Sequence, residues 1–245
     1  QTVSVTPVNG TRDNDNRAVQ ITHTVSGGDY NTVVAAAVNV AIADDDDSPT
    51  LSVDSPILDE GDDGATPTLT FKVTLDNSSD KEITVKYTDN AAGSALSGTD
   101  YEIIPGATLT FQPGELVKNI PVTTKGDYGV EPDETIILAF SNSSNTILGT
   151  ATATGTITND DATGMTATGG PLALDESAGD GLTYTIKLTS KPTANVTVVP
   201  AVTTGDAAVV SIEPASLTFT DANWNAAKTV TVKPVNDNID NLDRN

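Results

Sequence analysis

Thr68-Leu-Thr-Phe-Lys-Val-Thr-Leu75 alternates strictly between polar and apolar side chains. Successive side chains of an extended strand point to opposite faces. One face of this stretch therefore carries two leucines, a phenylalanine and a valine, and the other carries threonines and a lysine. A strand with this pattern buries one face against a core and leaves the other in solvent.

The same alternation recurs along the chain, with Gly, Pro, Asn, Asp and Ser between the alternating segments. In the central part it predicts seven strands, at about 51–58, 66–75, 82–88, 107–111, 116–123, 135–140 and 149–158. No segment shows a helical stripe of apolar residues. Many short strands at regular spacing are typical of β-sandwiches. The sequence therefore predicts an all-β protein made of tandem antiparallel, immunoglobulin-like sandwiches.

Internal repeats indicate how these sandwiches are organised. Gln1-Thr-Val-Ser-Val-Thr-Pro-Val-Asn9 matches Lys228-Thr-Val-Thr-Val-Lys-Pro-Val-Asn236, an offset of 227 residues. The same offset relates Asp13, Asn14 and Arg17 to Asp240, Asn241 and Arg244. We therefore expect one full period of a longer array, cut at equivalent points in two copies of one domain.

A weaker repeat lies within that period. Leu58-Asp-Glu60 matches Leu174-Asp-Glu176, and Leu109-Thr-Phe111 matches Leu217-Thr-Phe219. The period then consists of two related domains in alternation. We predict the C-terminal part of one sandwich at 1–48, a complete sandwich at 49–161 and the N-terminal part of another at 162–245.

The net charge and the composition of the chain argue against several classes of function. The net charge is −22, so nucleic acids and anionic membrane surfaces would be repelled. No apolar run approaches the length needed to cross a membrane. The chain has no Cys and one His, shows no nucleophile motif or phosphate-binding loop, and has few aromatic residues to line a substrate cleft. We therefore expect a protein that is not an enzyme.

The acidic residues are concentrated where alternate strands of the central sandwich would meet. Three strand connections and the end of the last strand share one apex, and carboxylates gather in them: Glu60, Asp62, Asp63, Asp89, Asp100, Glu102, Asp127, Glu131, Asp133, Glu134, Asp160 and Asp161. Two carboxylates about 5 Å apart repel by roughly 3 kcal/mol at an effective dielectric constant of about 20. Ca²⁺ accepts six to eight oxygen ligands from irregular loops, whereas Mg²⁺ needs stricter geometry and transition metals prefer His or Cys. Calcium is therefore the expected ion.

The central segment resembles the Calx-β family, the sandwich domain of sodium–calcium exchangers and many bacterial adhesins. The resemblance rests on Asp59-Glu-Gly61, Ser97-Gly-Thr-Asp-Tyr-Glu102, Leu109-Thr-Phe-Gln-Pro-Gly-Glu115, Asp127 with Glu131-Pro-Asp-Glu134, and Asn159-Asp-Asp161. It implies calcium ligands at Glu60, Asp100, Asp127, Glu131, Glu134, Asp160 and Asp161. The exchanger pattern closes on three consecutive aspartates, and here Asn159 replaces the first, with the loss or weakening of one ion site as the expected consequence.

The flanking segments resemble divergent relatives of the same domain. For the C-terminal copy, the resemblance implies apical acids at Glu176, Asp206, Asp237 and Asp240. For the N-terminal copy, Asp13 and the run Asp44 to Asp47, with Asp45, Asp46 and Asp47 as ligands, would serve the same purpose. The run is equally compatible with a charged linker.

These observations favour a calcium-binding structural repeat of an extracellular stalk, adhesin or filament on a bacterial cell surface. Calcium ions at the apices would stiffen the junctions, and adjacent repeats or neighbouring copies of the protein would be its partners. Two alternatives stay open: an adhesive module for glycan or protein, with Trp224, Tyr30 and Tyr128 as candidate contacts, and a regulatory calcium sensor.

Overall fold

The computed structural model describes residues 2–102, 104–177, 179–205 and 207–235. Within these ranges every regular element is a β-strand, apart from two short 3₁₀ turns, η1 (Gly28–Tyr30) and η2 (Ala207–Val209). No described helix is long and apolar enough to cross a membrane. The prediction of an all-β protein is confirmed.

The chain divides into two compact units. The first contains residues 1–58, 66–125 and 134–158. The second contains 59–65, 126–133 and the chain from 159 onward. Two loops that the sequence places in the central sandwich thus belong to the same unit as the C-terminal strands.

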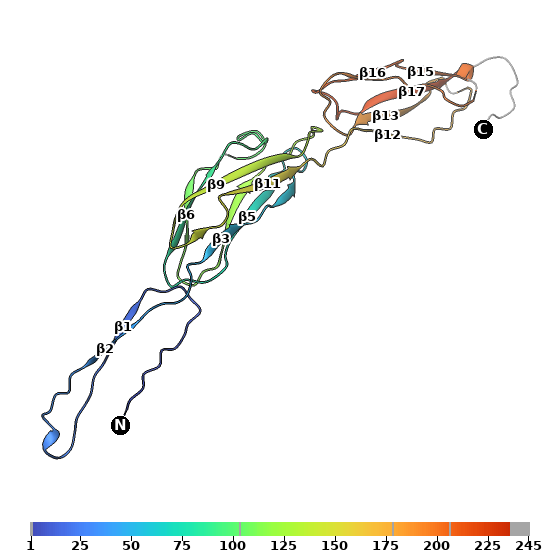
Figure 1. Cartoon of the computed structure of the whole chain (residues 1–245). Coiled ribbons are helices and arrows are strands. Elements are labelled where there is room, and N and C mark those ends of the chain that lie inside the picture. Colours follow the sequence, from blue (N-terminus) through green and yellow to red (C-terminus); the bar gives the residue numbers. More distant parts are fainter. Residues whose placement is uncertain (1, 103, 178, 206, 236–245) are drawn as a thin grey trace. The chain divides into compact units, whose positions relative to one another are not determined.

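The central sandwich consists of two sheets (Figure 1). The four-stranded sheet has the order β10 (Ile147–Leu148), β3 (Thr50–Val53), β5 (Thr68–Leu75), β8 (Val117–Thr123). The five-stranded sheet has the order β4 (Ile57–Asp59), β11 (Thr152–Thr158), β9 (Glu134–Ser144), β6 (Ile83–Asp89), β7 (Ala107–Phe111). The pairs β3–β5, β5–β8, β11–β9, β9–β6 and β6–β7 are antiparallel, and β10 pairs with β3 in parallel.

Alternation along the strands builds the core between these sheets. In β5 the apolar residues from Leu69 to Leu75 are buried while the polar residues between them stay more exposed. Phe71 and Phe111 are fully buried, and Leu51 and Leu138 join them in one apolar cluster. The core is thus the layer that the period-two pattern predicts.

Two strands differ from the prediction. The expected strand 51–58 is divided into β3 and β4, which belong to different sheets. Pro56 lies between them and has no N–H to donate, so the ladder of β3 cannot continue through it, while its carbonyl accepts from Thr156 N at 2.9 Å. Strand β9 runs to Ser144, past the predicted end at 140, because its register on β6 shifts at a bulge between Thr84 and Lys86.

The N-terminal segment forms a two-stranded antiparallel sheet of β1 (Arg17–Ile21) and β2 (Val38–Ile42), drawn in blue in Figure 1. Val19 faces Val40, and Ile21 faces Val38. Neither strand has a fully buried residue. The described part of residues 1–48 therefore supplies strands without a buried apolar cluster of its own.

The C-terminal strands form a second, smaller sandwich. One sheet has the order β12 (Met165–Thr168), β13 (Leu182–Leu188), β17 (Lys228–Pro234), β15 (Val210–Glu213). The other pairs β14 (Val196–Val198) with β16 (Leu217–Phe219). Its buried apolar cluster is Ile186, Leu188, Leu217, Phe219, Trp224 and Val230.

Candidate metal centre

The loops 59–65 and 126–133 touch at two glycines. A side chain on Gly126 would place its Cβ 1.9 Å from the carbonyl oxygen of Gly61, so only glycine permits this approach. Gly126 N also donates to the carbonyl of Ala65 at 3.1 Å. Gly61 has a φ of 78°, which glycine adopts without strain. The backbone therefore holds the loop of Glu60 against the loop of Asp127.

Asn159 attaches a third segment to these loops. Its side-chain oxygen accepts from Glu131 N at 3.2 Å, and its amide donates to the carbonyl of Asp161 at 2.9 Å. Its backbone N–H donates to the Asp133 carboxylate at 3.1 Å. An aspartate could accept the first bond but could not donate the second. The Asn159 side chain thus links the segment that carries Asp160 and Asp161 to the loop of Glu131. The resemblance to the exchanger pattern did not predict this role.

Three carboxylates converge where these segments meet. Glu60, Asp160 and Asp161 each offer an oxygen, and these oxygens lie within 4.8 Å of one another. Asp160 is exposed, while Glu60 and Asp161 are half-buried. One ion could therefore be reached by all three while keeping access to solvent on one side.

Two oxygens of this cluster are buried without a hydrogen-bond partner among the described residues. They are Oε1 of Glu60 and Oδ2 of Asp161. Leaving a buried polar atom unsatisfied costs about 1–3 kcal/mol, and more for a charged group. A bound cation would satisfy both oxygens at once, so the cluster fits a metal ion on its own geometry.

Burial and the neighbouring negative charges raise the pKa values of two of these carboxyl groups. Burial, followed by the charges of Asp127, Glu131, Asp161 and Asp160, raises the pKa of Glu60 to about 7. Burial, followed by Asp160, Asp62 and Asp127, raises the pKa of Asp161. A cation would offset this repulsion and return both groups to their ionised form.

The donor set is all oxygen: three clustered carboxylates with Asp127 and Glu131 close enough to act on Glu60. Hard divalent cations prefer such ligands, and Ca²⁺ tolerates their irregular arrangement on loops better than Mg²⁺ does. If it were bound here, calcium would be held by Glu60, Asp160 and Asp161, with Asp127 and Glu131 as the nearest further carboxylates.

Two other predicted ligands of the central domain have different surroundings. The Asp100 carboxylate accepts from Leu96 N at 2.6 Å, which caps the turn in which it lies. Glu134 is the first residue of β9 and pairs with Ile157 in the ladder to β11. Their place in a calcium site stays a prediction.

In the N-terminal segment, the Asp13 carboxylate is paired with a lysine. It is 3% exposed, and its carboxylate binds Lys81 Nζ at 2.9 Å and Ser79 Oγ at 3.0 Å. Backbone bonds of Asp13 with Ser78 and Asp80 reinforce the contact. Lysine therefore neutralises this carboxylate, and a metal role for Asp13 stays a prediction.

The acidic run beside it is more open. Asp45 and Asp47 are exposed, and burial together with Asp44 and Asp45 raises the pKa of Asp46. Glu176 lies exposed between β12 and β13. A metal role for Asp45, Asp46, Asp47 and Glu176 stays a prediction. Asp206, Asp237 and Asp240 lie outside the described residues.

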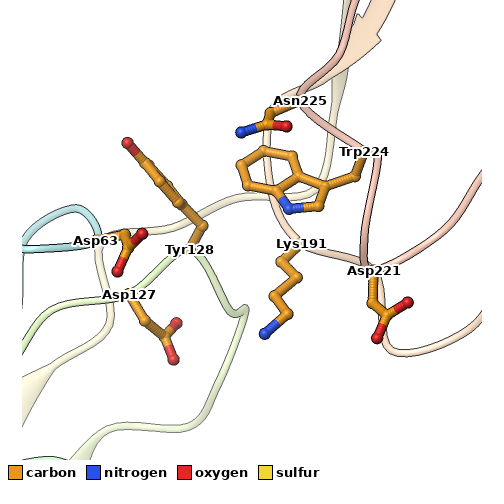
Figure 2. A pocket seen from close by; sticks show the side chains of 7 residues that line it. All are labelled: Asp63, Asp127, Tyr128, Lys191, Asp221, Trp224 and Asn225. Carbon is orange, nitrogen blue, oxygen red and sulfur yellow. The ribbon is translucent and has the colours of Figure 1, made fainter.

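Tyr128 connects the candidate site to the C-terminal cluster within the second unit. Figure 2 shows its ring beside Trp224, with ring centroids 5.1 Å apart in an edge-to-face arrangement. Lys191 N donates to the Tyr128 carbonyl at 2.8 Å. Asp63 and Asp127 line the same pocket of about 250 Å³ (Figure 2). Trp224 is itself buried, so it offers no open aromatic platform to a glycan.

The fold and the site define a β-sandwich module with carboxylates gathered on its apical loops. The Calx-beta domain family matches residues 37–161, more than half of the chain, and the chain belongs to that family. The resemblance of the central segment is thereby confirmed, and that of the flanking segments stays a prediction. Calx-beta domains are non-catalytic modules that typically bind calcium. No curated protein sequence matches the chain.

Among solved structures, the chain is similar to the apo form of the Calx CBD1 domain, with 22% identity over 47% of this chain and 100% of that one, at a TM-score of 0.39. It is also similar to CBD12 from CALX1.2, with 18% identity over 75% of each chain and a TM-score of 0.42. The calcium binding domain CBD12 of CALX1.1 gives 18% identity over 75% of this chain and 74% of that one, at 0.41.

Proposed function

We propose that this chain is a calcium-binding structural segment of an extracellular stalk, adhesin or filament on a bacterial cell surface. The observation that carries the calcium part is the pair of buried, unpartnered oxygens of Glu60 and Asp161 in a three-carboxylate cluster. The array part rests on the 227-residue internal repeat. Partners are then calcium ions and adjacent repeats of the same protein.

The proposed role of the ion is to hold three segments together. Loops 59–65 and 126–133 and the segment 159–161 converge on the cluster, and the chain continues from Asp161 into β12 only a few residues later. Without a cation, the mutual repulsion of the carboxylates favours their separation. With a bound cation, the segment 159–161 that leaves the central sandwich is held in place, and this short acidic junction becomes stiff.

Calcium titration by calorimetry tests the site, with chelator-treated protein as the starting state. Wild type should bind Ca²⁺, and Glu60→Gln should weaken binding at least about tenfold, which corresponds to about 1.4 kcal/mol. The matched control is Glu82→Gln, since Glu82 accepts from Gln112 Nε2 and an amide oxygen can still do so. Equal affinity in wild type and Glu60→Gln would rule out this cluster.

Small-angle scattering tests the stiffening separately. The maximum dimension and the flexibility of the chain should change when calcium is removed by a chelator. If calorimetry shows binding and the scattering curve does not change, calcium binds without stiffening the junction, and the stalk mechanism is wrong while the site stands.

A further inference from the structure

The segment 12–17 lies against the loop 76–82, which connects β5 to β6, within the first compact unit. Asp13 forms a parallel β-bridge with Ser79. The N–H and the carbonyl of Asp13 bond to the backbone on either side of Ser79, at 3.2 and 3.0 Å. Asp13 is 3% exposed and Ser79 is 2% exposed. The centre of this contact is therefore closed to solvent.

Both carboxylate oxygens of Asp13 have partners in this contact. Lys81 Nζ donates to Oδ1 at 2.9 Å, and Ser79 Oγ donates to Oδ2 at 3.0 Å. The backbone N–H of Lys81 donates in turn to Ser79 Oγ at 3.0 Å. Glu60 and Asp161 differ, since each keeps a buried oxygen without a hydrogen-bond partner among the described residues. The chain thus supplies to Asp13 the counter-charge that it does not supply to the three-carboxylate cluster.

The ammonium group of Lys81 lies between two acidic side chains. Its Nζ is 3.5 Å from Asp15 Oδ1, in addition to its bond with Asp13. That bond is the first cause of the raised pKa of Lys81, so the side chain stays charged at neutral pH. Arg12 and Arg17 add exposed ion pairs, which contribute little. A buried carboxylate that loses its partner is strongly destabilised, so the contact depends mainly on Lys81.

A backbone contact of the same kind occurs within the second compact unit. Gly129 forms a parallel β-bridge with Lys191, whose N–H donates to the Tyr128 carbonyl at 2.8 Å. Here the side chains in contact are aromatic, because the Tyr128 ring packs on Trp224. Lys191 follows β13 as Ser79 follows β5, and the two strands are alike in sequence at 185–189 and 70–74.

The other partners of the two contacts also occupy equivalent positions. Three stretches of the chain are alike in the internal repeats: residues 1–9, 120–122 of β8 and 230–232 of β17. Asp13 follows the first of these stretches, and Gly129 follows the second. The same pair of segments therefore meets twice by a parallel bridge, with different side chains each time.

We propose that the loop 76–82 is a docking surface for an acidic loop of the preceding domain in the array, and that Lys81 rather than calcium holds this contact. The partner that it fits places a carboxylate between the Ser79 hydroxyl and the Lys81 ammonium, as Asp13 does. The proposal uses the array part of the proposed function and is independent of the cluster at Glu60. Contacts of this type stay closed when calcium is removed.

Amide hydrogen exchange measured by NMR tests the contact, because Asp13 N and Asp80 N donate across it. In wild type both amides should exchange slowly, and equally slowly in calcium and in chelator. Lys81→Met removes the charge and keeps a long side chain, so both amides should exchange at least about tenfold faster. Lys81→Arg should restore the protection. Lys72→Met, at an exposed lysine of β5, is the control and should behave like wild type.

The amides of the ladder between β5 and β8 report whether the central sandwich stays folded. If they stay protected in Lys81→Met while Asp13 N and Asp80 N exchange freely, the contact has opened in a folded chain, as proposed. Wild-type protection of Asp13 N and Asp80 N in Lys81→Met would overturn the proposal. So would protection that chelator removes from wild type, since calcium would then be the counter-ion of Asp13. The wild-type comparison decides this even if Lys81→Met does not fold, and neither result depends on whether Glu60→Gln binds calcium.

Discussion

Glu60 combines a buried oxygen without a hydrogen-bond partner and a raised pKa. Its pKa is about 7 in the folded chain, against an ordinary value of 4.5, and the first cause is burial, followed by the charges of four neighbouring carboxylates. The carboxyl is therefore half-ionised near neutral pH unless a cation is present. This makes the residue a sensitive reporter of metal binding.

The metal-free protein should show this pKa in its stability. Between pH 4.5 and 7 the folded state holds a proton on Glu60 that the unfolded state has released, so this contribution to stability is present below pH 4.5 and is lost as pH rises through 7. Denaturant melts in chelator over this pH range should fall more steeply for wild type than for Glu60→Gln. Parallel profiles would contradict the raised pKa. Calcium should reverse the trend, because only the ionised carboxylate is a ligand.

Asn159 gives a second prediction at the residue scale. Asn159→Asp removes the hydrogen bond to the Asp161 carbonyl, which contributes about 1 kcal/mol, and adds a negative charge to a crowded cluster. In chelator the variant should be less stable than wild type in urea melts. In calcium the difference should shrink, because the new carboxylate can join the ligands. A variant that is more stable than wild type in chelator would contradict the linking role of Asn159.

Among the elements, the two apical loops 59–65 and 126–133 are in direct backbone contact. Gly126 lies so close to Gly61 that any side chain would collide with it. This contact places the loop of Asp127 beside the loop of Glu60, which belongs to the cluster.

Gly126→Ala should therefore separate the loops. We expect a loss of about 1–3 kcal/mol in the free energy of unfolding, as for other overpacked sites, together with weaker calcium binding by calorimetry. Gly179→Ala is the control, since a Cβ there meets nothing within 4 Å. If Gly126→Ala bound calcium like wild type, the loop contact would not be what assembles the site.

At the scale of the whole molecule, the loop 126–133 and the C-terminal apolar cluster share one compact unit. Tyr128 is flanked by Asp127 in the sequence and packs against Trp224, the single tryptophan of the chain. Ion binding at this loop should therefore change the surroundings of Trp224 in the C-terminal sandwich.

Tryptophan fluorescence measures this coupling directly. Calcium should change the emission of Trp224 in wild type. Tyr128→Ala should shift the emission to longer wavelength and remove the calcium response, because the indole loses the ring that covers it. Tyr30→Ala, an exposed tyrosine of η1, should behave like wild type. A full calcium response in Tyr128→Ala would show that the coupling does not run through this contact.

The sequence by itself determined the strands, the sandwich class and the loops that carry the acids. The reason is that period-two alternation and turn residues act locally, so Leu69 to Leu75 reveal a buried face without knowledge of any partner. The 227-residue repeat likewise needed only the sequence, and it predicts that residues 1–48 and 162–245 belong to one type of domain.

Only the tertiary structure decided which acids meet and which are already paired. Asp13 and Asp161 look alike in the sequence, yet Lys81 neutralises the first and the second keeps a buried, unpartnered oxygen. Three other features likewise have no signal in the sequence. These are the passage of the chain from one sheet to the other at Pro56, the hydrogen bonds of Asn159 and the packing of Tyr128 on Trp224. These features depend on contacts between segments far apart in the chain, and no local pattern encodes which of many exposed loops will touch.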